Sequence, residues 1–409
     1  MIAFLQKVKA ASRVVATLEG KTRSALLNEM AAAIEANSAA ILAANAQDTQ
    51  EAAALSSAMR DRLELNDKRV LEIAKGLKEI AALRDPIGET IDGWIAEDNL
   101  KIEKVAVPIG VVGVIYESRP NVTADVAALC FKSANAAILK GGKEAARSSA
   151  AIVSVLQGVL EKRGLPKEAI ALLPDSSREA VKWLVKQDKY IDLIVPRGGE
   201  ALISLVVQNA SVPVVKHDKG VCHLYLHESA EYDKAERIAI NAKVQKPSAC
   251  NAIETLLIDE AIAATFLPKL KAAFDRNKTE LRGCAKTRAI IDAKAASDED
   301  WSAEYLENVL AIKVVGAIDE AITHIQTYGS AHSEAIIARD YGAIERFLGE
   351  IDAACVYANA STRFTDGGKF GFGAEVGIST NKFHARGPMG IKELTTYKYR
   401  IYGNGQIRS

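Results

Sequence analysis

Apolar residues at helical spacing dominate the N-terminal part of the chain. Leu26, Leu27, Met30 and Ile34 recur at intervals that place them on one face of a helix. Thr22 precedes this run at a position that suits a helix cap. The pattern predicts an Ala-rich helical region over roughly the first 80 residues.

The pattern changes between residues 92 and 105. Apolar residues such as Trp94 and Ile102 lie on two short runs that flank the polar pair Asp98-Asn99. This arrangement predicts a β-hairpin with its turn near Asp98-Asn99. Polar residues lie on both arms, so we expect a hairpin near 92–107 that protrudes from the main body.

After Gly110, short apolar runs alternate with helical patterns. Strands are predicted at 111–116, 136–140, 170–173 and 191–195, and helices at 122–132, 144–162 and 178–186. A second series follows residue 250, with strands at 254–258, 310–315, 335–338 and 354–357 and helices at 261–274, 320–328 and 343–351. Such alternation indicates βαβ units and parallel sheets. We therefore predict an α/β fold with two domains and an active-site cleft between them.

The C-terminal part of the chain is Gly-rich from Gly367 to Gly390 and ends in a β-prone run at 394–402. A terminal strand exposes unpaired backbone groups unless it pairs, so we expect an oligomer contact there. The predicted domains are residues 1–243, with the N-terminal helices and the first sheet, 244–380, with the second series, and 381–409, with the C-terminal return and a β arm.

The balance of charge argues against some classes of partner. The 409 residues include 52 basic and 52 acidic side chains, with no dense run of Lys or Arg. This gives no electrostatic reason to expect nucleic acid or an anionic membrane. The five cysteines are irregularly spaced, which argues against a disulfide framework and for a reducing compartment. Because the N-terminus does not read as a signal peptide, we predict a cytoplasmic protein.

One cysteine stands where a thiol can act as a nucleophile. Cys250 lies in the run 245–251, Gln-Lys-Pro-Ser-Ala-Cys-Asn, just before a predicted strand. Pro247 and Ser248 break regular structure, so we expect the thiol on a loop beside N–H groups that can face an oxyanion. The alternative for any free cysteine is a small buried apolar residue. We keep that interpretation for the other four, Cys130, Cys222, Cys284 and Cys355.

Two glycine-containing turns follow predicted strands. Lys140-Gly141-Gly142-Lys143 opens a helix, and Pro196-Arg197-Gly198-Gly199 follows the strand that ends at residue 195. Neither turn has P-loop spacing, and no G-x-G-x-x-G motif follows the first strands. The amides and lysines of the first turn can meet a nucleotide phosphate, with a solvated turn as the alternative. On adjacent parallel strands, both turns would face the sheet edge where α/β proteins bind ligands.

The histidines raise the question of a metal site. His217, His223 and His227 all stand at odd-numbered positions on strand-like runs, where alternate residues share a face. No set of Asp, Glu or Cys with ligand spacing accompanies them. Because metal sites need three or four convergent ligands, we predict no metal. His223 and His227 are interpreted as strand-face residues. A triad of Cys250 with one of these histidines stays open.

Several runs together resemble the aldehyde dehydrogenase superfamily over essentially the whole chain. They are residues 116–123 (Tyr-Glu-Ser-Arg-Pro-Asn-Val-Thr), 138–145, 196–199, 248–257, 359–368 and 384–390. The resemblance is closest to the group that reduces L-glutamyl 5-phosphate to L-glutamate 5-semialdehyde, the second step of proline biosynthesis. It implies an aldehyde dehydrogenase-like fold with a Rossmann-like cofactor domain, an α/β catalytic domain and a small β oligomerisation arm.

The resemblance also implies roles for individual residues. Cys250 is the expected nucleophile, with its own N–H and the side chain of Asn121 as oxyanion donors. NADPH is the expected cofactor, with contacts to Lys140, Lys143, Arg197, Gly198, Gly199 and Glu304. The substrate is strongly anionic, and the cations expected to meet it are Arg119, Lys246, Arg363 and Arg386. A homo-oligomer and functional coupling to glutamate 5-kinase are further expectations.

One departure from the family pattern bears on the reaction. Hydrolytic members carry Glu-Leu-Gly-Gly upstream of the nucleophile, and that Glu activates water. Here the matching stretch, 216–220, reads Lys-His-Asp-Lys-Gly. The resemblance therefore implies a Cys250 thioester that exchanges with phosphate rather than with water. Two alternatives remain, a hydrolytic dehydrogenase of a similar semialdehyde and a non-catalytic member that serves as a scaffold or a nucleotide-binding subunit.

Overall fold

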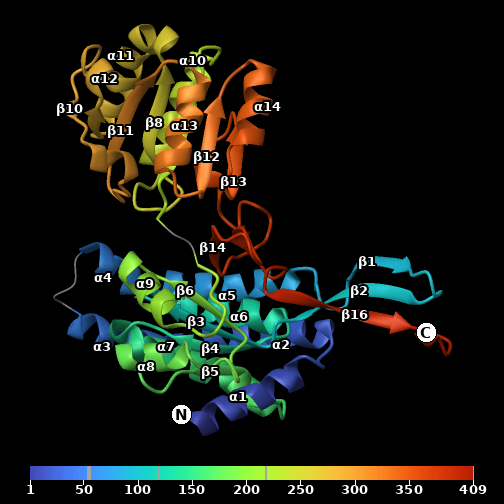
Figure 1. The fold of residues 1–409 in the computed structure, drawn as a ribbon. Helices are drawn as coiled ribbons and strands as arrows, with labels where there is room; N and C mark the ends of the chain where they lie inside the picture. The colour runs from blue at the N-terminus through green and yellow to red at the C-terminus, as the bar shows by residue number, and fades with distance from the viewer. Residues whose placement is uncertain (53–56, 118, 217–218, 409) are drawn as a thin grey trace. The chain divides into compact units, whose positions relative to one another are not determined.

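The chain folds into two compact units, seen in a computed structural model that describes residues 1–52, 57–117, 119–216 and 219–408 (Figure 1). The first unit comprises Met1–Lys216, Gly371–Gly377 and Met389–Ser409. The second comprises His217–Phe370 and Ile378–Pro388. The C-terminal part of the chain therefore contributes to both units.

The first unit is built on a parallel sheet of four strands. In sheet order they are β5 (Ile170–Leu172), β4 (Ala136–Lys140), β3 (Val111–Tyr116) and β6 (Leu193–Arg197). Every residue of β3 is buried, as expected for a parallel strand covered on both faces. The strand order reverses between β3 and β6, and such a switch point is where open α/β sheets bind ligands at the carboxyl ends of the strands.

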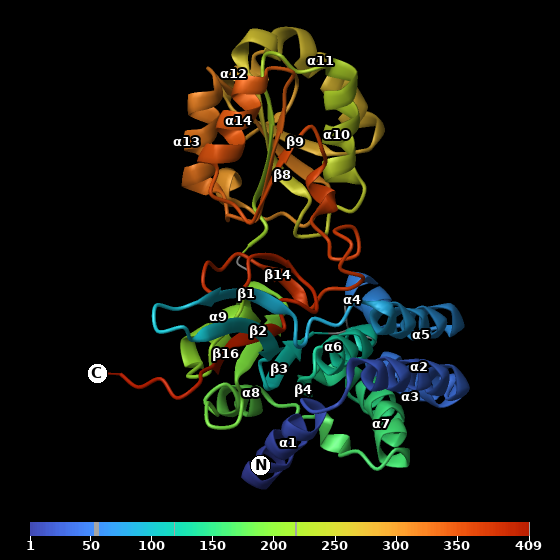
Figure 2. The same ribbon diagram turned by 90° about the vertical axis from the view of Figure 1, so that its right-hand side faces the viewer.

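Helices cover both faces of this sheet (Figure 2). One face packs against α1 (Ile2–Val15), α8 (Arg178–Leu184) and α9 (Glu200–Asn209). The helices α6 (Pro120–Lys132) and α7 (Ala146–Lys162) pack on β4 and β5, and α2 (Gly20–Ala36), α3 (Ser38–Glu51) and α5 (Asp67–Ala82) pack on them in turn. The short helix α4 (Ser57–Leu63) contacts α3. Within the described ranges, no helix combines the length and the apolar composition needed to span a bilayer.

The predicted hairpin is confirmed and belongs to a small three-stranded arm of the first unit. Strand β1 (Thr90–Ile95) pairs with β2 (Lys101–Pro108), and Asn99 takes a left-handed conformation in the turn, with φ of 57°. The C-terminal strand β16 (Thr395–Tyr402) pairs antiparallel with the other side of β2. The terminal run therefore finds a partner within its own chain, and β16 becomes an edge strand.

The second unit contains a parallel sheet of seven strands. In sheet order they are β10 (Lys294–Ala295), β9 (Glu280–Gly283), β11 (Val309–Val315), β8 (Ile253–Asp259), β7 (Cys222–Leu226), β12 (Ser333–Ile337) and β13 (Cys355–Ala358). One face packs against α10 (Tyr232–Val244), α11 (Glu260–Arg276) and the segment that follows α12 (Ala285–Arg288). The other face packs against α13 (Ile318–Tyr328) and α14 (Tyr341–Glu350).

The structure divides the chain differently from the predicted boundary at residue 243. Strand β7 lies between β8 and β12 and is hydrogen-bonded to both, so it belongs to the second sheet. Helix α10 packs on that sheet as well. Both elements precede Cys250, and the second α/β series therefore begins before the cysteine rather than after it. Helices α9 and α10 are missing from the predicted elements.

We expect Phe266→Ala to lower the free energy of unfolding by about 3–5 kcal/mol. Phe266 of α11 is fully buried, and its ring stacks on Tyr232 of α10 with 4.4 Å between centroids. Urea unfolding followed by circular dichroism measures the change. The control is Phe383→Ala, because the Phe383 side chain is 93% exposed. An equal loss of stability in both variants would contradict the packing described for α10 and α11.

Candidate active site

Cys250 lies on a tight turn at the amino edge of the second sheet. The turn joins α10 to β8, and the N–H groups of Ala249 and Ala252 donate to the carbonyls of Lys246 and Ala249 at 3.1 and 2.9 Å. Cys250 is partly exposed, whereas Cys130, Cys222 and Cys355 are buried. The predicted loop position of Cys250 is confirmed, and it suits a thiol that must meet a substrate.

The residue after Cys250 is held by the segment 361–365. The hydroxyl of Thr362 donates to the carbonyl of Asn251 at 2.6 Å, and the amide of Asn251 donates to the carbonyl of Thr365 at 2.7 Å. The Thr365 hydroxyl is in turn hydrogen-bonded to Ser333 on β12 and Tyr357 on β13, each at 2.7 Å. The cysteine turn is therefore anchored to two further strands of the same sheet.

Gly220 lies against the backbone of Cys250. A Cβ at position 220 would come within 2.1 Å of the Cys250 carbonyl oxygen, so this contact requires glycine. The N–H of Gly220 donates to Glu304 Oε1 at 2.9 Å. The thiol of Cys222 donates to the same Cys250 carbonyl at 3.3 Å. Glu304, expected at a nicotinamide ribose, is thus found bonded to the segment that packs on Cys250.

Two of the four predicted substrate cations lie near Cys250. Lys246 is exposed on the cysteine turn itself. Arg363 is partly buried in the short 3₁₀ helix η4 (Thr362–Phe364), where its Nε donates to Gln245 at 2.8 Å. Burial lowers the pKa of Arg363, and the charges of Cys250 and Asp366 oppose that effect. The guanidinium therefore favours negative charge on the Cys250 sulfur, as reactive thiols require.

Arg386, the third predicted substrate cation, is paired with a carboxylate. It forms an ion pair with Asp352 at 2.7 Å and donates to the Asp352 carbonyl at 3.1 Å. Its charge also acts on Cys355. Asp352 also pairs with Lys382, so one carboxylate serves two cations at this position. The fourth cation, Arg119, is exposed at the N-cap of α6 in the first unit.

The remaining cysteines differ in reactivity. Burial raises the pKa of Cys130 to about 12 and that of Cys222 well above its usual value. Burial also raises the pKa of Cys355. For Cys284 burial acts in the same direction, but hydrogen bonds from Thr287 and nearby N–H groups outweigh it and lower the pKa. Cys284 is therefore the one competing thiol that a test of Cys250 must include.

In the first unit, the predicted cofactor turns lie at the carboxyl ends of β4 and β6. They are not on adjacent strands as proposed, because β3 lies between them. The end of β3 contacts both turns. The ring of Tyr116 lies so close to Gly141 that a Cβ there would approach it to 3.2 Å, and Glu117 accepts from the N–H of Gly199 at 3.0 Å. The two turns are thus joined at the switch point of the sheet.

The lysines of the first turn differ in exposure. Lys140 is partly buried at the end of β4, and burial lowers its pKa while the charges of Glu144 and Asp175 oppose the shift. Lys143 is exposed at the start of the short helix η1 (Lys143–Ala145). Both cations are therefore placed where an anionic dinucleotide would meet the edge of the sheet.

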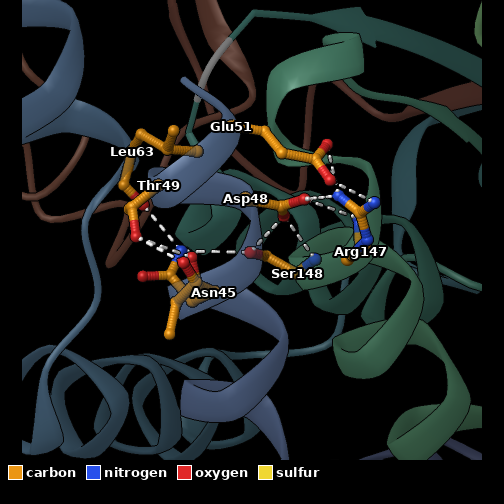
Figure 3. Close-up of polar contacts among 8 residues, drawn as sticks. Asn45, Asp48, Thr49, Glu51, Leu63, Arg147 and Ser148 are labelled. Atoms are coloured by element: carbon orange, nitrogen blue, oxygen red, sulfur yellow. Dashed lines mark hydrogen bonds and ion pairs between the residues drawn. The ribbon is translucent and has the colours of Figure 1, made fainter. Parts of the chain in front are cut away.

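The helix after this turn is already capped by an internal carboxylate (Figure 3). Asp48 of α3 accepts from the N–H groups of Arg147 and Ser148 at 3.3 and 2.8 Å, and from the Ser148 hydroxyl at 2.6 Å. Asn45 donates to the same hydroxyl at 3.0 Å, and Arg147 pairs with Glu51. These two amides of α7 are therefore occupied, so candidate phosphate contacts on this side come from the preceding turn, which includes Lys140 and Lys143.

Asn121 and Arg197 lie near a carboxylate that the sequence analysis did not identify. Asn121 is exposed on the first turn of α6, and its amide donates to Asp125 at 3.3 Å. Arg197 donates to the Glu375 carbonyl at 3.3 Å, and its charge acts on Asp125. Asp125 and Asn121 stand four residues apart on one helix, and this i to i+4 spacing is the signal that sequence reasoning could have used.

Across the described part of the chain, no group of three or more His, Cys, Asp or Glu is arranged to hold a metal ion. His223 is a buried residue of β7, as predicted, and bonds to Glu334 at 2.9 Å. His217 and Asp218 lie outside the described residues, as does Ser118 of the 116–123 run.

Comparison with known proteins places these observations in a family. The sequence profile described as the aldehyde dehydrogenase family matches residues 2–283. A gamma-glutamyl phosphate reductase from Nautilia profundicola is 60% identical over 406 residues, 99% of each chain. One from a Sulfurovum species is 60% identical over 410 residues, all of both chains. The crystal structure of a gamma-glutamyl phosphate reductase from Thermotoga maritima matches with a TM-score of 0.98 at 44% identity, over 100% of this chain and 99% of that one. The predicted aldehyde dehydrogenase-like fold is confirmed.

The pKa of Asp125 predicts a pH dependence of stability. Burial by the surrounding protein raises this pKa from 3.8 to about 6, although the charge of Arg197 and the hydrogen bond from Asn121 oppose it. Because the folded-state pKa lies above the unfolded value, the contribution of Asp125 to stability is present below about pH 4 and is lost as the pH rises through about 6. Wild type should lose up to about 3 kcal/mol relative to Asp125→Asn over this interval.

Urea unfolding of both proteins between pH 4 and pH 7 measures this difference. The control is Asp98→Asn, since Asp98 is exposed in the turn of the hairpin. The assignment fails if the two variants follow the same pH dependence relative to wild type.

Proposed function

Because the chain belongs to the aldehyde dehydrogenase family, we propose that it reduces L-glutamyl 5-phosphate to L-glutamate 5-semialdehyde with NADPH and releases phosphate. This reaction is the second step of proline biosynthesis. The full-length relatives at 60% identity that are named gamma-glutamyl phosphate reductase support the choice of substrate. The observation that carries the chemistry is the partly exposed Cys250 on an anchored turn beside Arg363.

In the proposed mechanism Cys250 is the nucleophile. Its thiolate attacks the acyl carbon, a sulfur–carbon bond forms, and the bond to the phosphate oxygen breaks so that phosphate leaves with the bonding pair. The product of this step is an acyl thioester on Cys250. A bound NADPH would supply the hydride that converts the thioester to a thiohemiacetal. The sulfur then departs as a thiolate, the carbonyl forms, and the hydroxyl proton is lost to solvent.

Both tetrahedral species carry a negative oxygen that needs hydrogen-bond donors. The proposed donors are the N–H of Cys250 and the side chain of Asn121. Each well-placed donor of this kind contributes roughly 3–4 kcal/mol to stabilisation of the transition state. The hydrogen bond to Asp125 uses one of the Asn121 amide protons and leaves the second available.

The proposed substrate carries a carboxylate and an acyl-linked phosphate, so cations are expected around Cys250. Arg363 and Lys246 are the contacts best supported by position. Arg119 and Arg386 stay proposed contacts, and Arg386 would have to meet the substrate while keeping its ion pair with Asp352. The stretch 216–220 lacks the glutamate that activates water in hydrolytic relatives, which supports transfer to and from phosphate.

The first unit fits an anionic dinucleotide. Gly141 brings the backbone close to Tyr116 at the switch point, and a larger residue would fill that space. Lys140 and Lys143 would contact the adenosine ribose and its 2′-phosphate. Arg197, Gly198 and Gly199 would lie near the pyrophosphate, and Glu304 is the proposed contact to the nicotinamide ribose. A cofactor contact at Glu304 would have to coexist with its hydrogen bond to Gly220.

We also propose a homo-oligomer formed through the arm, and functional coupling to glutamate 5-kinase. The edge strand β16 supports the first proposal, because Tyr399, Ile401 and Tyr402 are at least half exposed on it. An exposed apolar edge strand is a ready surface for pairing with another copy. The five free cysteines support a reducing, cytoplasmic location.

The decisive assay is phosphate-dependent reduction of NADP⁺ by glutamate 5-semialdehyde, the reverse reaction. We expect wild type to require phosphate or arsenate, and Cys250→Ala to lose at least about 10³-fold in kcat, as enzymes do when the nucleophile is removed. Cys284→Ala is the matched control, a second partly exposed thiol in the same unit, and should retain activity.

Two outcomes would reject the proposal in different ways. Equal rates with and without phosphate would identify a hydrolytic dehydrogenase. No turnover in wild type would favour the alternative of a non-catalytic nucleotide-binding member, and full turnover in Cys250→Ala would reject Cys250 as the nucleophile.

Cofactor choice is tested at Lys143. Lys143→Ala is expected to raise KM for NADPH about 10-fold or more, because one charge-assisted contact to the 2′-phosphate contributes about 1.5–3 kcal/mol and about 1.4 kcal/mol corresponds to a factor of ten. The KM for NADH should change much less. Steady-state kinetics with each cofactor measure both values, with Lys162→Ala, at the last position of α7, as the control. An equal change for NADPH and NADH would remove Lys143 from 2′-phosphate recognition.

A further inference from the structure

The turn that carries Cys250 is closed at its base by a buried ion pair. Lys243 is in the last turn of α10, seven positions before Cys250, and Glu254 is on β8, four positions after it. The ammonium of Lys243 lies 2.5 Å from Glu254 Oε2, and both side chains have no exposed surface. The pair thus joins the two ends of the segment that presents the cysteine.

Stability alone is a poor reason to keep such a pair. Taking two charges out of water costs several kcal/mol for each ion, and well-packed apolar residues often replace a buried pair without loss of stability. Burial lowers the pKa of Lys243 and raises that of Glu254 to about 7, whereas their mutual attraction opposes both shifts. Burial of each charge therefore costs free energy, which indicates that the pair has a structural role in holding its neighbours in place.

The second oxygen of Glu254 reaches the segment that contains Glu304. Glu254 Oε1 accepts from the N–H of Leu306 at 3.3 Å, and the Lys243 ammonium lies 5.8 Å from the centre of the Tyr305 ring. Leu306 takes a left-handed backbone conformation, with φ of 53°, which a branched apolar residue adopts only when its surroundings hold it. The ion pair therefore fixes the backbone immediately after Glu304.

Other contacts fix the same segment from its far side. The hydroxyl of Tyr305 donates to Asp300 Oδ1 at 2.7 Å, and Arg282 donates to the same oxygen at 2.7 Å. Tyr305 and Leu306, which follow Glu304, are held by these contacts. The Glu304 carboxylate accepts from the N–H of Gly220, and Gly220 lies against the Cys250 backbone. A continuous chain of contacts thus runs from Lys243 through Glu254 and Glu304 to Cys250.

We propose that Lys243 and Glu254 are positioning residues for the nucleophile, which hold the Cys250 turn at its base and, through residues 304–306, support the Gly220 contact. The inference rests on the proposed function only in so far as Cys250 is the reacting group. Neither residue is assigned contact with substrate or cofactor. Their effect is on the placement of the Cys250 sulfur relative to Arg363 and the turn amides.

The test compares Lys243→Met/Glu254→Met and Glu254→Gln with wild type. The double variant replaces the pair by apolar side chains of similar length, and Glu254→Gln keeps an acceptor for Leu306 but removes the charge. The first readout is the rate of iodoacetamide alkylation at Cys250 as a function of pH, followed by mass spectrometry of the Cys250 peptide. The second is kcat in the phosphate-dependent assay, with thermal unfolding measured in parallel.

We expect both variants to fold, and the double variant to unfold within a few degrees of wild type. Alkylation of Cys250 at neutral pH should slow about 10-fold, with its half-maximal pH moved upward, because the sulfur is less well placed beside Arg363. The value of kcat should fall about 10- to 100-fold, the range expected for a displacement of about 1 Å at a reacting group, with smaller changes in KM.

The control is Arg23→Met, which breaks a partly buried ion pair with Asp85 in the first unit. It should lower the unfolding temperature and leave Cys250 alkylation unchanged. The proposal is overturned if both test variants show the same alkylation profile and the same kcat as wild type. If the double variant fails to fold, Glu254→Gln alone decides. Alkylation needs no turnover, so a wild type without phosphate-dependent activity would reject the proposed function while the positioning role could still be judged.

Discussion

Parallel pairing of β7 with β8 and β12 is the constraint on which the candidate site depends. Because the three strands run in the same direction, the segments that precede them meet at one edge of the sheet. Gly220, Cys250 and Ser333 come from distant parts of the chain and converge there for that reason. The close contact of Gly220 with Cys250, and the hydrogen bonds through Thr365, follow from this alignment. Cys250 is thus held by contacts at the edge of the sheet as well as by hydrogen bonds within its own turn.

Several charged and polar side chains at this edge of the sheet are fully buried. Lys243 and Glu254 lie under the cysteine turn, and His223 and Glu334 lie on the neighbouring strands without exposed surface. Buried polar groups are costly unless they are paired, and once paired they admit few alternative arrangements. The ion pair and the His223–Glu334 contact therefore restrict how this edge can rearrange, while the Cys250 side chain itself stays partly exposed. Such a combination suits a nucleophile that must be accessible and well placed at once.

Sequence reasoning succeeded where the local pattern was strong. Residues 111–116 and 136–140 coincide with β3 and β4, since buried parallel strands appear as continuous apolar runs. Helix α10 escaped prediction because its buried face consists largely of alanines, at 235, 239 and 242, which give weak contrast with polar neighbours. The two glycine turns were expected on adjacent strands, but the order of strands depends on pairing across the sheet. No local pattern reports that order.

The sequence by itself determined the α/β succession, the family, and the position of Cys250 on a loop, because these rest on periodicity and on motifs contained in short runs. Only the tertiary structure decided which charges meet. It placed Arg363 near Cys250 and Arg386 on Asp352, joined Glu304 to Gly220, and paired Lys243 with Glu254 beneath the turn. These contacts join segments up to 114 residues apart. Their partners are chosen by strand order and burial, which no short stretch of sequence encodes.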